Sequence, residues 1–155
     1  MTASEVALRF AVAVLVGGSI GLNRDLRGKP AGVRTHALVC LGAALLTVVA
    51  SDGADAASAS RVMQGIITGI GFIGAGVILH RDSGKSVRGL TTAATIWIVA
   101  TLGIACGAAA WEPVGFGTGL TLLVLVVGGP VERVFHRLVG RPPNAGGSPG
   151  EPPSA

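Results

Sequence analysis

The residues that could do chemistry gather in two segments rich in arginine, glycine and threonine, residues 21–36 and 81–92. Their polar side chains include Arg24, Asp25, Arg34, Thr35, Arg88, Thr91 and Thr92. An arginine fork beside hydroxyl groups can hold a carboxylate or a phosphate in a fixed geometry, and the start of a helix adds N–H groups that favour an anion. The segments therefore predict a basic surface for an anion such as a lipid phosphate. Charges that only fix orientation at the headgroups explain them equally well.

Other kinds of site find little support. His36, His80 and His136 share no metal-ligand spacing and no cysteine accompanies them, so we treat them as interfacial histidines and expect no metal or cofactor. The sequence holds no Ser-His-Asp set, Walker loop or metalloprotease helix. A Gly-x-Gly-x-x-Gly pattern occurs at residues 69–74, but the dinucleotide interpretation requires a preceding strand. We therefore expect no enzymatic activity, and no nucleic-acid partner.

The elements that must position these residues are membrane spans. Hydrophobic residues make up 50% of the chain and charged residues 13%, against roughly 25% charged in soluble domains. The apolar blocks approach the ~17 to 25 residues that cross hydrocarbon, and they are apolar all round, which favours helices over barrel strands. They are residues 6–22, 37–50, 62–79, 90–110 and 114–131, the second being short enough to borrow Thr35 and His36.

The predicted fold is an all-α membrane protein, a bundle of about five transmembrane helices. Residues 1–140 form the transmembrane domain, and residues 141–155, mostly Pro, Gly, Ser and Ala, form a disordered tail. Basic residues follow the first, third and fifth blocks, which predicts an outside N-terminus and a cytoplasmic C-terminus. Arg9 is an exception inside the first block, where we expect it to snorkel to the interface or to pair with Glu5.

Small residues predict how the spans pack. Glycines four residues apart recur in four blocks, and such pairs let helix backbones approach closely. The pairs are Gly17 and Gly21, Gly65 and Gly69, Gly103 and Gly107, and Gly115 and Gly119. The third block is the richest, with Gly65, Gly69, Gly71, Gly74 and Gly76. We expect these glycines to pack against another helix of the same chain, with a homo-oligomer as the alternative, and we expect Cys40 and Cys106 to be plain packing residues.

Three motifs carry a family resemblance. They are Lys-Pro-Ala-Gly-Val-Arg-Thr-His from Lys29, Arg61 followed by Gly-Ile-Gly-Phe-Ile-Gly-Ala-Gly from Gly69, and Val-Arg-Gly-Leu-Thr-Thr-Ala-Ala-Thr-Ile-Trp from Val87. Over about residues 17–107 the chain resembles the MgtC/SapB family of bacterial membrane proteins. The resemblance implies a multi-pass inner-membrane protein with about five helices. It also implies links to low-magnesium growth, to survival of pathogens inside host cells, and to membrane partners, notably ATP synthase.

The chain departs from the family pattern at three places. Asn23-Arg24-Asp25 stands where members often carry Glu-Arg-Glu, and Ser58 stands where members carry an aspartate three residues before Arg61. Asp55 is the candidate to replace that aspartate. Many members add a soluble C-terminal domain, and this chain looks like a short, SapB-like member without it.

The leading hypothesis is a non-enzymatic regulatory membrane protein whose helices bind a partner complex while its loops anchor to lipids or sense. The alternative is a transporter or channel component for Mg²⁺ or another cation. That alternative requires a polar path, whereas no Asp or Glu lies in the middle of any predicted span. The candidate functional residues are Arg24, Asp25, Arg34, Thr35, Arg61, Arg88, Thr91 and Thr92.

Overall fold

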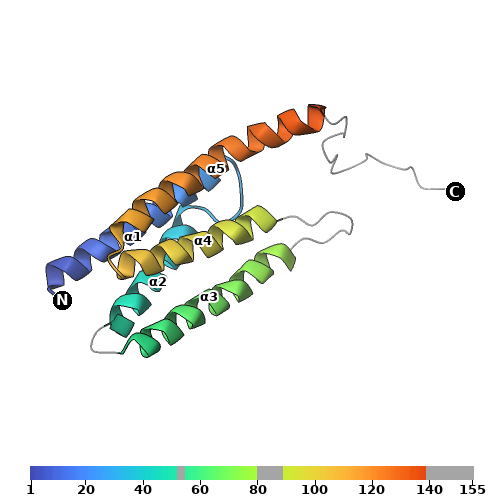
Figure 1. The fold of residues 1–155 in the computed structure, drawn as a ribbon. Coiled ribbons are helices and arrows are strands. Elements are labelled where there is room, and N and C mark those ends of the chain that lie inside the picture. Colours follow the sequence, from blue (N-terminus) through green and yellow to red (C-terminus); the bar gives the residue numbers. More distant parts are fainter. Residues whose placement is uncertain (52–54, 80–88, 139–155) are drawn as a thin grey trace.

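The predicted all-α membrane fold is confirmed. The structure, a computed structural model, describes residues 1–51, 55–79 and 89–138, and its regular elements there are helices (Figure 1). Each helix is long and apolar enough to cross a membrane, so the chain is a multi-pass membrane protein. They are α1 (Ala3–Leu26), α2 (Val33–Ser51), α3 (Ala56–Leu79), α4 (Leu90–Gly107) and α5 (Trp111–Leu138). The predicted tail, residues 141–155, lies outside the described residues.

The helices alternate in direction along one common axis. The N-terminus lies at the same end of the bundle as the start of α3 and the start of α5, and the starts of α2 and α4 lie at the opposite end (Figure 1). That opposite end carries Arg24, Arg27, Lys29 and Arg34. We call it the basic end, and its cytoplasmic orientation stays a prediction from the charges.

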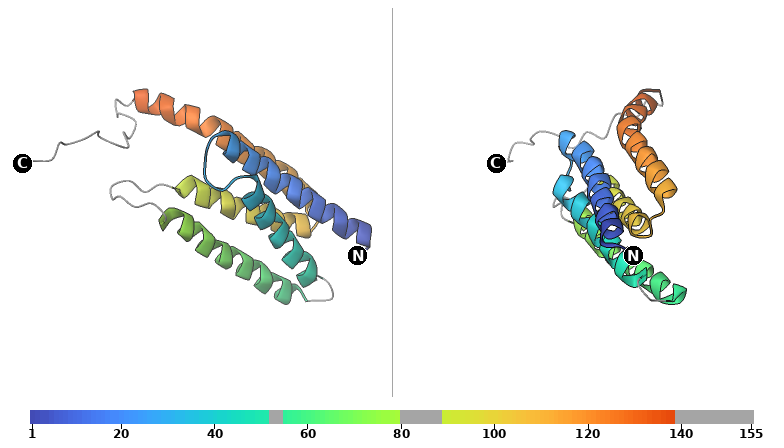
Figure 2. Two further views of the ribbon diagram at one scale, coloured as in Figure 1. Left: turned by 180° about the vertical axis from the view of Figure 1, so that it is seen from behind. Right: turned by 90° about the vertical axis from the view of Figure 1, so that its left-hand side faces the viewer.

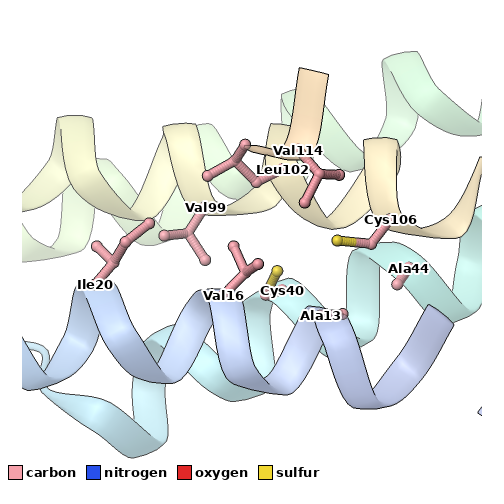
Figure 3. Close-up of a cluster of buried hydrophobic side chains, with 9 residues drawn as sticks. All are labelled: Ala13, Val16, Ile20, Cys40, Ala44, Val99, Leu102, Cys106 and Val114. Carbon is pink, nitrogen blue, oxygen red and sulfur yellow. The ribbon is translucent and has the colours of Figure 1, made fainter. Parts of the chain in front are cut away.

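Helices α1, α2 and α4 form the centre of the bundle. Helix α3 packs on α4 and α2 at one side, and α5 packs on α4 and α1 at the other (Figure 2). The core cluster lies between the central helices and the start of α5 (Figure 3). It consists of Ala13, Val16, Ile20, Cys40, Ala44, Val99, Leu102, Cys106 and Val114. Both cysteines are free and fully buried in this cluster, where they pack as small apolar side chains.

Glycines on the central helices permit unusually close backbone contact. A Cβ placed on Gly17 would lie 2.8 Å from Cys40 Cβ and 2.9 Å from Ala37 Cα, both on α2. On α4, a Cβ at Gly103 would lie 2.8 Å from Ala43 Cβ, and one at Gly107 would lie 2.7 Å from Thr47 Cβ. Because real Cβ atoms do not approach this closely, α1 and α4 pack on α2 only with glycine at these positions.

The glycines of α3 behave differently, and contrary to the expected packing, four of them make no close contact with the described part of the chain. A Cβ added at Gly65, Gly69, Gly71 or Gly76 would meet no atom within 4 Å. Within the described residues, Gly74 alone among these five faces a neighbour, with its added Cβ 3.5 Å from Ala93 Cβ on α4. The reason is that α3 packs through its other face, where Ile66 is buried against Ala43 and Ala100.

Arg9 also differs from expectation. Its Nη1 donates a hydrogen bond of 2.7 Å to the carbonyl oxygen of Gly107, in the last turn of α4. Glu5 is engaged elsewhere, because its carboxylate accepts from the N–H of Thr2 in a capping box that starts α1. A guanidinium at a helix C-terminus satisfies an unpaired carbonyl and suits the negative end of the helix dipole. Arg9 therefore ties α1 to α4.

Candidate functional site

Arg24 is the centre of the polar contacts at the basic end. It continues the buried stripe of α1 that includes Ile20 and Gly21, and its side chain is only 4% exposed. Its Nη2 donates a hydrogen bond of 2.6 Å to Oγ1 of Thr92 on α4, which is 3% exposed. Its Nε has no hydrogen-bond partner among the described residues. The structure thus brings together two of the predicted site residues, Arg24 and Thr92. The hydroxyl of Thr92 is a neutral acceptor, so it does not compensate the positive charge of the guanidinium.

The start of α4 adjoins this arginine and lacks a side-chain cap. Its N-cap is Gly89, which has φ +95° and makes no side-chain hydrogen bond to the helix. The first helical bond runs from the N–H of Ala93 to the carbonyl of Gly89. The three preceding N–H groups of α4, including that of Thr92, therefore have no partner within the helix. A Cβ at Gly89 would lie 2.9 Å from the carbonyl oxygen of Val77, so glycine is required both by conformation and by space.

Asp25 has a structural role at the start of α2. Its Oδ2 accepts a hydrogen bond of 2.9 Å from the N–H of Val33, the first residue of that helix. A side chain at Gly32 would overlap the carboxyl group of Asp25. This contact explains why α2 begins at Val33, well before the apolar block that starts at Ala37. Sequence analysis selected Asp25 but did not identify its partner, since the contact joins groups eight residues apart across a loop.

His36 is a residue whose setting the sequence analysis missed. It was expected at the membrane interface, but it is fully buried on the first turn of α2, where its backbone oxygen faces Gly17 of α1. Its Nδ1 lies 3.0 Å from the carbonyl oxygen of Gly32, and its Nε2 has no partner among the described residues. The signal available in the sequence was Gly17, whose missing side chain makes room for this turn of α2.

The remaining candidates divide into three groups. Arg34, Thr35 and Thr91 are exposed at the basic end. Arg88 lies outside the described residues. Arg61 lies in the first part of α3, toward the other end of the bundle from Arg24 (Figure 1), so the structure does not place it in the same site.

Among the described residues, Arg61 pairs with Ser58 and with no carboxylate. Its Nη2 lies 3.0 Å from Ser58 Oγ. Asp55 instead caps α3, with its Oδ1 accepting a hydrogen bond of 2.6 Å from the N–H of Ser58. Side-chain and backbone hydrogen bonds from Ser58 lower the pKa of the Asp55 carboxyl below its ordinary value of 3.8. Asp55 therefore does not take over direct contact with Arg61.

One long face of α3 is left uncovered by the residues that the structure describes. Its exposed residues recur every three or four positions and are Arg61, Gln64, Gly65, Thr68, Gly69, Phe72, Ala75 and Gly76, which we call the outer face of α3. Phe72 is 85% exposed. An apolar groove of about 640 Å³ runs beside it, between α3 and α2, and includes Gly42, Gly65 and Gly69 in its walls.

Comparisons with known proteins agree on one family. The family model described as MgtC family matches residues 10–134. The chain is 42% identical over 149 residues to "Putative magnesium transporter YhiD" of Escherichia coli, covering 91% of this chain and 65% of that protein. It is 47% identical to "Protein SrpB" of Synechococcus elongatus, covering 77% of this chain and 72% of that protein. It is 40% identical to "Protein MgtC" of Brucella abortus, of which it spans 55%. No solved structure matches the chain.

Proposed function

Because this chain belongs to the MgtC family, we propose that it is a non-enzymatic regulator that binds another complex in the bacterial inner membrane. The observation that carries the proposal is the outer face of α3. We take this face as the docking surface for a transmembrane helix of the partner. The magnesium-related names of its relatives support a role in magnesium homeostasis or in growth at low magnesium.

The chemistry of the outer face favours a helix over lipid tails. Gly65 and Gly69 lie four residues apart with open space above them, the arrangement that lets a second helix approach to backbone distance. Gln64 places an amide on the same face, and hydrocarbon offers no hydrogen-bond partner for it. A partner helix would supply both the close contact and the polar group. ATP synthase, which the family resemblance implies, is our candidate partner.

The alternative is transport of Mg²⁺ or another cation, as the name of the YhiD relative suggests. The packing of the central helices gives this alternative less support. Where α1, α2 and α4 meet, Ala13, Cys40 and Val99 are fully buried, and glycine contacts bring the backbones together. Two of the buried hydroxyls there bond to their own helices, Thr47 to the carbonyl of Ala43 and Thr95 to that of Thr92, and the hydroxyl of Thr92 is taken by Arg24. An ion path would need oxygen ligands directed away from the helices.

The proposal is tested by blocking the outer face without disturbing the bundle. The double variant Gly65→Leu, Gly69→Leu adds side chains at positions where a Cβ meets no described atom within 4 Å. We expect it to insert and accumulate normally, to lose the partner in affinity purification from native membranes, and to fail to restore low-magnesium growth of a deletion strain.

The matched control is Gly115→Leu, Gly119→Leu on α5. These glycines also lie four residues apart and also have nothing within 4 Å, but Phe116 and Leu120 flank them and no amide accompanies them. The control should keep both the partner and growth. Full function of the α3 variant, or equal loss in both variants, would contradict the assignment of the docking face.

A further inference from the structure

We infer that Arg24 and the first turn of α4 form a binding site for a phosphate group, either on a lipid headgroup or as free phosphate. This inference does not depend on the proposed partner or on the outer face of α3. It rests on a buried guanidinium held against an uncapped helix start.

The arrangement concentrates positive charge where the described residues supply no counter-charge. Arg24 is 4% exposed, and the acceptor that the structure gives its guanidinium is the neutral hydroxyl of Thr92. Its Nε is buried without a partner in the described part of the chain. A buried charge is costly unless a charged group and further hydrogen bonds compensate it. The carboxylate of the neighbouring Asp25 is already engaged by Val33.

The helix contributes positive charge of the same sign. Thr92 is the third residue of α4, so Arg24 meets this helix at its N-terminus, which carries the positive end of the helix dipole. A cation is normally favoured at the C-terminal end of a helix, and Arg9 of α1 occupies that end of α4 through its hydrogen bond to the carbonyl oxygen of Gly107. An anion between Arg24 and the first turn of α4 would turn this repulsion into attraction on both sides.

The N–H donors at the start of α4 suit an oxyanion. The N–H groups of Leu90, Thr91 and Thr92 have no acceptor within the helix, and Gly89 offers them no capping side chain. Together with the guanidinium they form a set of N–H donors on two helices, which is the chemistry that binds phosphate at helix starts. The place also fits, because α1 ends and α4 begins at the basic end, where a bilayer carries its headgroups.

The test uses the full chain in nanodiscs and measures the shift of its thermal unfolding midpoint. One arm replaces part of a neutral lipid, monogalactosyl diacylglycerol, by phosphatidylglycerol with the same acyl chains. A second arm adds inorganic phosphate against chloride at equal ionic strength. A shift in the first arm assigns the phosphate to lipid, and a shift in the second assigns it to free phosphate. Either result supports the site if the shift depends on Arg24, and no shift in either arm overturns it.

Three variants show whether the shift comes from this site. Arg24→Gln keeps donors for Thr92 but removes the charge, and it should weaken phosphate binding by about tenfold or more. Arg24→Lys keeps the charge but loses the fork, and we expect an intermediate loss. Lys29→Gln removes one charge from the same loop at an exposed position and should bind like the wild type. An equal loss in Lys29→Gln and Arg24→Gln would reduce the effect to general surface charge and overturn the proposal.

A folding defect is separated from lost binding by Thr92→Ser, which keeps the hydroxyl that Arg24 uses. If Arg24→Gln does not fold, the comparison of Arg24→Lys with Thr92→Ser decides. Weaker phosphate binding in Arg24→Lys alone supports the site. Wild-type binding in Arg24→Lys contradicts the requirement for a guanidinium fork and overturns it.

Discussion

The central helices and α3 use the same residue, glycine, for opposite purposes. In α1 and α4, Gly17, Gly103 and Gly107 face a neighbouring backbone so closely that a Cβ would overlap it. In α3, Gly65 and Gly69 have the same four-residue spacing, but a Cβ added at either would meet no described atom within 4 Å. The same glycine spacing can therefore serve packing between helices of one chain or leave a helix face open for contact with another protein. Substitutions that add volume distinguish the two uses.

The largest effect is expected from Gly103→Leu. The added side chain would enter space filled by Cys40 and Ala43 of α2, so the central helices must separate. We expect the free energy of unfolding in detergent, measured by SDS titration, to fall by roughly 1–3 kcal/mol or more. The free energy of unfolding of the matched variant Gly69→Leu should stay within ~0.5 kcal/mol of the wild-type value. Equal losses in the two variants would remove the distinction between the regions.

A smaller version of the comparison uses alanine. Gly107→Ala places a methyl group against Thr47 of α2 and should lower the thermal unfolding midpoint. Gly65→Ala adds a methyl group in open space and removes a flexible residue from a helix, which stabilises by up to about 1 kcal/mol in soluble helices. We expect the two midpoints to move in opposite directions. A fall of the same size in Gly65→Ala would show that α3 is packed there.

The next effect concerns neighbouring threonines on the first turn of α4. Thr92→Val removes the acceptor of the buried Arg24 guanidinium, which should cost about 1–3 kcal/mol of unfolding free energy. Thr91→Val changes an exposed hydroxyl and should cost little. Unfolding of both variants under identical detergent conditions measures the difference. Similar values for the two would contradict the assignment of Arg24 to Thr92.

The smallest effect is expected at the exposed start of α3. Hydrogen bonds from Ser58 lower the pKa of the Asp55 carboxyl below its ordinary value of 3.8. The ionised Asp55 cap therefore stabilises the start of α3 above pH 3.8, and this stabilisation is lost as the pH falls from there through the lowered pKa. Hydrogen exchange of residues 56–60 should therefore lose protection between about pH 5 and pH 3 relative to Asp55→Asn, which cannot titrate. Identical pH profiles in the two proteins would show that the cap does not hold the helix.

The sequence predicted the spans well because each apolar block is sufficient to define a helix in a membrane. It placed the start of α2 too late, because the cap of Val33 comes from Asp25, which lies across a loop. It predicted that glycines mediate packing, but spacing alone does not say which face meets a neighbour, so the glycines of α3 were assigned to the chain's own bundle.

The sequence predicted which residue types gather at the candidate site, but only in part which of these residues contact one another. Arginine and threonine at the basic end were selected together, but Arg34 and Arg24 could not be ranked from the sequence. The structure shows that Arg24 continues the buried stripe of α1 while Arg34 is exposed on α2. Whether Arg24 or Arg34 is buried depends on how α1, α2 and α4 meet, and residue spacing along a single helix does not predict this.

The most direct test of the docking face is site-specific photo-cross-linking in native membranes. A photoreactive residue replaces Thr68 on the outer face of α3, or Leu123 on α5, which is 55% exposed. We predict that the probe at Thr68 forms a discrete cross-link to a subunit of another membrane complex and that the probe at Leu123 does not. A cross-link only between two copies of this chain would show that the outer face of α3 is a homo-oligomer interface and not a docking surface for another complex. No protein cross-link at Thr68, or equal cross-links at both positions, would contradict the account.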